Sequence, residues 1–403
     1  MAGLQSRLRA LPGTPRVVVS GNLSVPWEAV RALDATVPAY VVHALNAPPG
    51  LPEREGVTAE TCFVGPGMRR HPGLRYVPSR LSLVPLLFAR TLPPDVVLLH
   101  CAPPVDGQLS LGIEVNVLPA AVEACRSRGG LVVAVVNPRM PYTFGDAQLP
   151  VEHVDLAVEV DSALATHEPG TPDEDSATIG ERVAAMVRDG ATLQLGIGAV
   201  PDATLAALAG RRDLRVWTEM FSDGVLALDA AGALDADHPL VASFCFGSEH
   251  LYAWLDRNPR VRMLRTEKTN DPGLIAQQRR MTSVNTALEV DLFGQANASR
   301  INARIYSGFG GQTDFIVGAL HSPGGQSFIA LRSWHPRADV STIVPLVDEP
   351  VTSFQQSAIV TEQGVAPLWG HDERTQAHHI IERAAHPRVR DDLREEAHAL
   401  GLL

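Results

Sequence analysis

Residues 192–208 read TLQLGIGAVPDATLAAL: a short apolar run, a glycine-containing turn, and an apolar segment with helical spacing. Residues 17–33, VVVSGNLSVPWEAVRAL, repeat this order, with identical residues at five of seventeen positions. In both stretches a Val-Pro pair precedes the apolar segment, and proline suits the first turn of a helix. We infer a strand, a turn and a helix near the start of each half of the chain, which indicates an internal duplication. Chance similarity between two units of this common type is the alternative.

The rest of the chain also alternates strand-like and helix-like segments. DVVLLHCA (95–102) and GLVVAVVNP (130–138) are typical of buried strands. This alternation predicts an α/β fold made of two tandem, related α/β domains with mainly parallel sheets. Prolines, glycine and acids cluster between residues 165 and 178, so we place the boundary there. The predicted domains are residues 1–172 and 173–403.

Length, charge and cysteine content restrict the class of protein. A chain of 403 residues is too long for one ordinary core, so two domains are expected. The net charge of -11, with no basic block, argues against a nucleic acid or an anionic membrane as partner. No apolar run reaches the ~18 residues of a membrane helix, and the first residues lack a signal-peptide core. Four cysteines without a C-x-x-C pair indicate neither a metal site nor a disulfide framework, so we expect a reduced, cytoplasmic setting.

Two acids, Glu289 and Asp291, stand in the strand-like stretch VNTALEVDLFGQ at 284–295. On a strand they share one face, and a half-buried strand with its acids in water is the simpler interpretation. A carboxylate can also attack an activated acyl carbon, while backbone N–H groups stabilise the resulting oxyanion. Glu219 is a further acid, near the end of the strand-like RVWTEM (215–220) and just before a turn. A strand ending in a polar turn is the simpler interpretation of this stretch.

Glycine clusters precede and follow this acidic stretch. Glycine lets a backbone approach a ligand closely and present its N–H groups to a phosphate, thioester or carboxylate oxygen. Glycine-rich turns between strands are the alternative. The sequence contains no P-loop, no clean G-x-G-x-x-G after a strand, no H-E-x-x-H, no G-x-S-x-G and no cluster with metal-ligand spacing. Three glycines within four residues, Gly308, Gly310 and Gly311, are the candidate ligand-binding residues.

Several longer stretches together resemble one known family. They include LQLGIGAVPDATL (193–205), NDPGLIAQQRRMTSVNTALEVDLFGQANA (270–298), YSGFGGQTDFIVGA (306–319) and IVTEQGVAPLWG (359–370). Stretches of the first half, such as PPVDGQLSLGIEV (103–115), match as well. The chain resembles the acetyl-CoA hydrolase/CoA-transferase family over nearly its whole length, in particular the 4-hydroxybutyrate and butyrate CoA-transferase branch.

The resemblance implies an active site at the interface of the two domains, and a homodimer. Coenzyme A is implied as a substrate and not as a permanently bound cofactor, with acyl-CoA and short-chain carboxylates as partners. Glu289 occupies the position of the family's catalytic glutamate, whose carboxylate attacks the acyl-CoA thioester and then carries CoA as a glutamyl-CoA thioester. Gly364, in a T-E-x-G-x-A motif, is implied as a donor to the oxyanion. By the same resemblance, Gly310 and Gly311 would line the CoA channel, with Gly196 and Gly198 near the site. The substrate or CoA contacts that we expect are Gly196, Gly198, Gly308, Gly310, Gly311 and Gln312.

Three functions fit this resemblance. The first is a CoA-transferase that exchanges CoA between short-chain acids of the acetate, butyrate or 4-hydroxybutyrate class. The second is an acetyl-CoA or acyl-CoA hydrolase, in which water intercepts the enzyme-bound species, and no residue separates it from the first. The third is a non-catalytic CoA-binding protein. After IAL the family commonly continues with Pro-Ser-Thr, whereas this chain has Arg332-Ser333-Trp334, which leaves the identity of the acids open.

Overall fold

The computed structural model describes residues 1–403, which form two compact units. Unit 1 comprises Met1–Glu168, Leu240–Thr269 and Ile305–Gly310, and unit 2 comprises Pro169–Pro239, Asn270–Arg304 and Gly311–Leu403. Each unit therefore takes its residues from three separate stretches of the sequence. The continuous domains 1–172 and 173–403 remain a prediction about how the chain divides. No helix is both long and apolar enough to span a bilayer.

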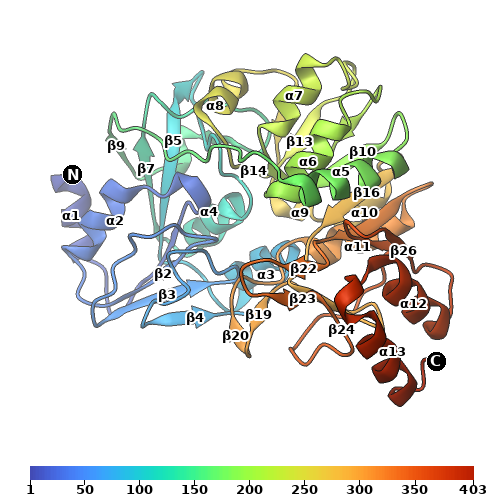
Figure 1. Ribbon diagram of the computed structural model, residues 1–403. Coiled ribbons are helices and arrows are strands. Elements are labelled where there is room, and N and C mark those ends of the chain that lie inside the picture. The colour runs from blue at the N-terminus through green and yellow to red at the C-terminus, as the bar shows by residue number, and fades with distance from the viewer. The chain divides into compact units, whose positions relative to one another are not determined.

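Unit 1 is built on a nine-stranded sheet (Figure 1). Its parallel part has the order β4-β3-β2-β1-β5-β7-β9, and β6 and β8 continue antiparallel from the far end of the long strand β5. These strands are β1 (Arg16–Val19), β2 (Tyr40–His43), β3 (Val57–Thr61), β4 (Leu74–Tyr76), β5 (Val96–Val105), β6 (Gln108–Ser110), β7 (Leu131–Val136), β8 (Gln148–Pro150) and β9 (Leu156–Glu159). Every residue of β7, LVVAVV, is buried, as expected for a parallel strand covered on both faces.

The remaining elements of unit 1 are helices and three short strands. The helices are α1 (Ala2–Arg9), α2 (Trp27–Asp34), α3 (Val84–Arg90), α4 (Leu118–Ser127), α8 (Glu249–Leu255) and α9 (Thr266–Thr269). The strands are β13 (Leu240–Ala242), β14 (Phe244–Cys245) and β15 (Val261–Met263). The predicted strand-turn-helix at 17–33 is confirmed: β1 is followed by the turn at Gly21 and by α2.

Unit 2 contains a six-stranded sheet in the order β11-β10-β16-β21-β25-β26, parallel except for β26. These strands are β10 (Thr192–Leu195), β11 (Arg215–Val216), β16 (Met281–Asn285), β21 (Gln326–Ala330), β25 (Ala358–Val360) and β26 (Val365–Pro367). The helices are α5 (Glu174–Met186), α6 (Ala199–Ala207), α7 (Gly224–Ala230), α10 (Pro272–Ala276), α11 (Gln312–His321), α12 (Glu373–His379) and α13 (Arg390–Ala399). Shorter strands are β12 (Met220–Phe221), β17 (Glu289–Asp291), β18 (Ala296–Asn297), β19 (Arg300–Ile301), β20 (Arg304–Ile305), β22 (Trp334–His335), β23 (Val340–Ser341) and β24 (Ile343–Val344).

The second predicted strand-turn-helix is β10, the turn at Gly196, and α6, so the α/β fold with mainly parallel sheets is confirmed.

The strand order of unit 2 reverses between β10 and β16. From β10 the chain continues to β11 on one side, whereas β16, β21 and β25 lie on the other side. Leu195, at the end of β10, pairs with Val284 of β16, so the loops that leave these strands start next to each other. In open parallel sheets the crevice at such a reversal is where ligands bind, at the carboxyl ends of the strands. The turn at Gly196 and the segment after Asn285 therefore begin at the place where this fold supports a site.

We expect the core of unit 2 to depend strongly on β21. Ile329 of this strand is fully buried, whereas Ile301 of β19 is 44% exposed. Ile329→Ala should lower the free energy of unfolding by about 2–5 kcal/mol, because it leaves a cavity in a packed core. Ile301→Ala is the matched control and should change it by no more than about 0.5 kcal/mol. Urea unfolding measures both, and equal losses would contradict the packing described here.

Candidate functional site

Glu219 follows β11 at the carboxyl edge of the unit 2 sheet. The hydroxyl of Thr218 donates to the backbone oxygens of Leu195 (3.3 Å) and Met220 (3.0 Å), which fixes this segment to the end of β10. The Glu219 side chain is only partly exposed, and its Oε2 accepts a hydrogen bond of 2.6 Å from Nδ2 of Asn270. The carboxyl group is thus held in one orientation, at the sheet edge where the strand order reverses.

Gly311 packs against this carboxyl group with no room for a side chain. A Cβ atom at position 311 would lie 2.0 Å from Oε2 of Glu219 and 2.2 Å from Nδ2 of Asn270. Gly311 also precedes the first residue of α11, so the backbone N–H groups of the first helical turn start at this point. The positive end of a helix dipole favours negative charge, which a reacting carboxylate or an oxyanion would supply.

The surroundings of Glu219 alter its acidity. Burial raises the pKa of the Glu219 carboxyl to about 7, the hydrogen bond from Asn270 opposes this rise, and the charge of Asp314 adds to it. Asp314, in the first turn of α11, is itself 1% exposed. A carboxyl group with this pKa is partly ionised at neutral pH, and its carboxylate is more basic than that of an ordinary glutamate. Both properties suit a nucleophile that must also leave in a later step.

If ionised Glu219 is the reacting group, activity should depend on pH near neutrality. A pKa raised to about 7 means that the protonated, unreactive form accumulates as the pH falls through that value. We expect kcat/KM to be near its plateau above ~pH 8 and to fall about tenfold per pH unit below ~pH 6. A pH series of initial rates measures this, and a flat profile down to ~pH 5, as for a carboxyl of ordinary pKa, would contradict it.

Glu289, the residue that the sequence resemblance favours, opens the short strand β17. Its partly exposed side chain accepts a 2.8 Å hydrogen bond from Nδ2 of Asn297, its partner across β17 and β18. The same amide donates to the backbone oxygen of Arg300 at 2.9 Å. Asp291, also noted in the sequence, is 2% exposed and accepts from the N–H groups of Phe293, Gln295 and Val347. Asp291 therefore holds a turn together, and Glu289 braces a hairpin in this structure.

Three other predicted residues lie at the same edge of unit 2. Gly196 and Gly198 form the turn after β10; no heavy atom lies within 4 Å of where their Cβ atoms would be, and Gly198 has a φ of +118°. Gln312, the first residue of α11, donates from Nε2 to the backbone oxygen of Thr286 at 3.4 Å. This bond links α11 to the segment between β16 and Glu289. The edge thus combines a glycine turn, a helix start and two acids.

Gly364 has partners of its own. Its N–H donates to the oxygen of Thr361 at 3.2 Å, and the N–H of Thr361 donates back to Gly364 at 2.9 Å. A Cβ at this position would lie 2.7 Å from the backbone oxygen of Arg383, so this close approach alone requires glycine. The oxyanion role of Gly364 remains a prediction, and it would require this turn to open.

Gly308 and Gly310 belong to unit 1, where both are buried. A Cβ on Gly308 would lie 2.5 Å from the oxygen of Cys62, and Gly310 has a φ of +57° with the ring of Phe63 beside it. Both positions therefore require glycine for local packing.

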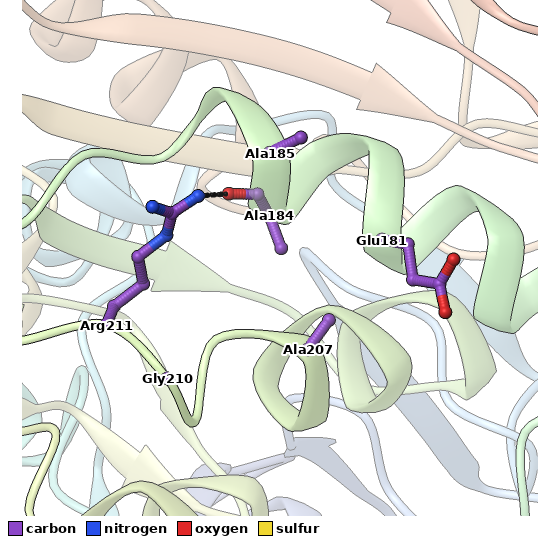
Figure 2. Close-up of a pocket in the computed structure, with 6 residues that line it drawn as sticks. All are labelled: Glu181, Ala184, Ala185, Ala207, Gly210 and Arg211. Atoms are coloured by element: carbon purple, nitrogen blue, oxygen red, sulfur yellow. Dashed lines mark hydrogen bonds between the residues drawn. The ribbon is translucent and has the colours of Figure 1, made fainter.

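A surface pocket of about 330 Å³ lies between α5 and α6 (Figure 2). Its lining is Glu181, Ala184, Ala185, Ala207, Gly210 and Arg211. Arg211 donates to the backbone oxygen of Ala184 at 2.9 Å, which satisfies a carbonyl near the end of α5. The pocket contains no predicted site residue, so it is not the candidate site. Nowhere in the chain do three His, Cys, Asp or Glu side chains gather in a way that would hold a metal ion.

Sequence reasoning noted Glu219 but interpreted it as a strand end, and it missed Asn270. The signal that points to Glu219 is its place shortly after β11, the strand next to β10, which borders the strand-order reversal. Asn270 carries no comparable signal, because its role depends on a partner 51 residues away in the chain.

Comparison with known proteins identifies the family. The family model for the acetyl-CoA hydrolase/transferase C-terminal domain matches residues 247–397. The chain is 35% identical to the 4-hydroxybutyrate coenzyme A transferase of Clostridium kluyveri, over 94% of this chain and 93% of that protein. Among solved structures, RipA from Yersinia pestis is 27% identical with a TM-score of 0.92, over 99% of this chain and 97% of that one. The 4-hydroxybutyrate CoA-transferase of Porphyromonas gingivalis is 31% identical with a TM-score of 0.83, over 98% and 97%. The chain belongs to the acetyl-CoA hydrolase/CoA-transferase family.

Proposed function

We propose that this protein transfers coenzyme A between short-chain carboxylic acids of the acetate, butyrate or 4-hydroxybutyrate class, with Glu219 as its reactive carboxylate. The observation that carries the proposal is the Glu219 carboxyl, with its pKa raised to about 7, oriented by Asn270 and packed against the backbone of Gly311. A family named for acyl-CoA chemistry requires a nucleophile or base of this kind.

The chemistry balances without ATP or a metal ion. The Glu219 carboxylate attacks the thioester carbon of an acyl-CoA, the C–S bond breaks, and a mixed anhydride and CoA thiolate form. The thiolate then attacks the glutamyl carbonyl carbon, the free acid leaves as carboxylate, and a glutamyl-CoA thioester remains. A second carboxylate reverses these steps and leaves as the new acyl-CoA. Each step exchanges one activated acyl bond for another, and binding of the nucleotide part of CoA helps to drive the strained steps.

Glu289 remains the competing assignment for the reactive carboxylate. The geometry favours Glu219 because raising a carboxyl pKa by burial makes its anion more reactive, whereas Glu289 accepts from an amide that also braces the Asn297–Arg300 turn. Replacing each glutamate in turn by glutamine separates these two assignments.

The function is tested by supplying acetyl-CoA with and without a second acid, such as butyrate or 4-hydroxybutyrate, and following free thiol and the new acyl-CoA. We expect new acyl-CoA that appears only with the acid, without net thiol release. Thiol release independent of the acid would identify a hydrolase, the activity that the family name also covers. CoA binding without either product would identify a non-catalytic protein.

Some finer expectations accompany this proposal. Residues Gly196, Gly198, Gly308, Gly310, Gly311 and Gln312 are proposed as substrate or CoA contacts. A homodimer and a cytoplasmic location are expected from the family resemblance and the reduced cysteines. Light scattering of the purified protein tests the first, and fractionation of the source cells tests the second.

A further inference from the structure

The two groups that lie against the Glu219 carboxyl stand at the starts of two helices of unit 2. Asn270, whose amide donates to Oε2 of Glu219 at 2.6 Å, comes two residues before the first residue of α10. Gly311, where an added Cβ would meet the same oxygen, directly precedes α11. The distance between Asn270 and Gly311 therefore depends on how closely α10 and α11 pack.

The two helices pack so closely that position 318 of α11 has no room for a side chain. A Cβ atom on Gly318 would lie 2.5 Å from both Cβ and Cγ2 of Ile275 in α10, and 3.1 Å from the backbone oxygen of Pro272. Ile275 is fully buried, so it cannot turn aside into solvent. Glycine inside a helix is less favourable than alanine, and close packing is the property that it supplies here.

The contact belongs to a small core cluster that also includes the segment leading to Glu219. The buried members come from α10, β16 and α11, and they are Ile275, Met281, Phe315 and Ala319. The ring of Trp217, two residues before Glu219, packs against this cluster. One cluster thus connects both helices with the residues that carry the carboxyl.

Hydrogen bonds fix both ends of the helix pair. The hydroxyl of Ser322, which follows α11, donates to the backbone oxygen of Gln278 at 2.6 Å, just after α10. At the other end, the carboxylate of Asp271 accepts from the N–H of Leu274 at 2.8 Å and caps α10 beside Asn270. The spacing of the two helices is therefore set by their contact and not by a loose connection.

We propose that Gly318 and Ile275 are positioning residues for the reaction. Their contact sets the spacing of α10 and α11, and this spacing keeps the two helix starts on the carboxyl of Glu219. This inference rests on the proposed function, because it takes Glu219 as the reactive group. A reacting group keeps its geometry only when the residues behind it are themselves locked by packing.

Loosening the helix pair should raise the pKa of Glu219. The hydrogen bond from Asn270 lowers this pKa, and the negative charge of Asp314, on α11, raises it with a smaller effect. When the helices separate, the ionised carboxyl loses the bond from Asn270, so it holds its proton to a higher pH.

The test follows the ionisation of Glu219 without using the reaction. ¹³C NMR of protein labelled at the glutamate side-chain carboxyls follows the titration, and Glu219→Gln identifies the signal by removing it. Gly318→Ala, which forces the helices apart, should move the midpoint upward by about 0.5–1 pH unit. Ile275→Ala, which adds no clash and leaves a cavity in the contact, should move it in the same direction by less. It decides the question alone if Gly318→Ala does not fold.

Ile359→Ala is the matched control. It removes an equally buried isoleucine of unit 2, in β25, that belongs to another core cluster. Its loss of stability should resemble that of Ile275→Ala, but the midpoint of Glu219 should stay where it is in the wild type. Circular dichroism confirms that each variant is folded.

Turnover gives the second readout. The pH at which kcat/KM for CoA exchange falls should rise in Gly318→Ala and Ile275→Ala, and not in Ile359→Ala. An unchanged midpoint in the folded contact variants, or an equal shift in Ile359→Ala, would overturn the proposal. Failure of the wild-type protein to exchange CoA would reject the proposed function, while the NMR titration would still decide whether the helix contact holds the carboxyl of Glu219.

Discussion

Glu219→Gln is expected to lower kcat/KM for CoA exchange by about 10³-fold or more, because the amide cannot form the anhydride and thioester intermediates. Glutamine preserves the size of the side chain and can still face Asn270, so the protein should fold and bind CoA. Steady-state exchange between acetyl-CoA and butyrate measures the loss, and calorimetry with CoA measures the retained binding.

Glu289→Gln is the matched comparison for this experiment. If Glu289 only braces its hairpin through Asn297, Glu289→Gln should reduce the exchange rate by no more than about tenfold. The reason is that the hydrogen bond from Asn297 would then go to a neutral amide oxygen in place of a charged carboxylate. The reverse pattern, with a large loss at Glu289 and a small loss at Glu219, would assign the chemistry to Glu289, as the sequence resemblance predicts. Loss of CoA binding in either variant would show that the residue supports structure as well.

Gly311→Ala is expected to give the second-largest effect, a fall in kcat of about 10²-fold. The added methyl group would lie 2.0 Å from Oε2 of Glu219 and 2.2 Å from Nδ2 of Asn270, so the carboxyl must move out of its hydrogen bond. A displacement of about 1 Å at a reacting group costs about a hundredfold in rate. Crowding of this kind also destabilises by about 1–3 kcal/mol, which urea unfolding can measure.

Gly210→Ala is the control for Gly311→Ala. Gly210 follows α6 in the same unit, has no positive φ, and its added Cβ would have no heavy atom within 4 Å. Its exchange rate and unfolding midpoint should match those of the wild type. If Gly311→Ala retained full activity, the close packing of Gly311 on Glu219 would have no role in the reaction.

The fold could be predicted from local patterns because each signal lies within about twenty residues. The apolar run, the turn glycine and the Val-Pro pair of 192–208 specify β10, its turn and α6 without any distant partner. Segments such as Ile305–Gly310 could not be assigned in this way. They pack with unit 1 through bonds to residues about 240 positions earlier, and such bonds leave no periodic trace in the sequence.

The carboxyl that we propose as the reactive group was harder to predict. Glu289 stands out in the sequence because it interrupts an alternation of apolar residues. The partner of its hydrogen bond, Asn297, is only eight positions away. Glu219 looks like an ordinary strand end, and its raised pKa comes from burial and from the charge of Asp314, which tertiary structure alone brings to it. Burial of a titratable group is a property of the whole fold. Glycine clusters can therefore be recognised in a single sequence more readily than a buried acid.

Trapping the covalent intermediate tests the central claim most directly. Borohydride reduces a glutamyl thioester to an alcohol, which marks the residue that carried CoA. Trypsin separates the two acids, because Glu219 lies in the peptide 216–257 and Glu289 in the peptide 281–300. After addition of acetyl-CoA and borohydride, mass spectrometry should find the reduced residue at Glu219 in peptide 216–257, and only in samples that received acetyl-CoA. A reduced residue in peptide 281–300, with peptide 216–257 unmodified, would contradict the account.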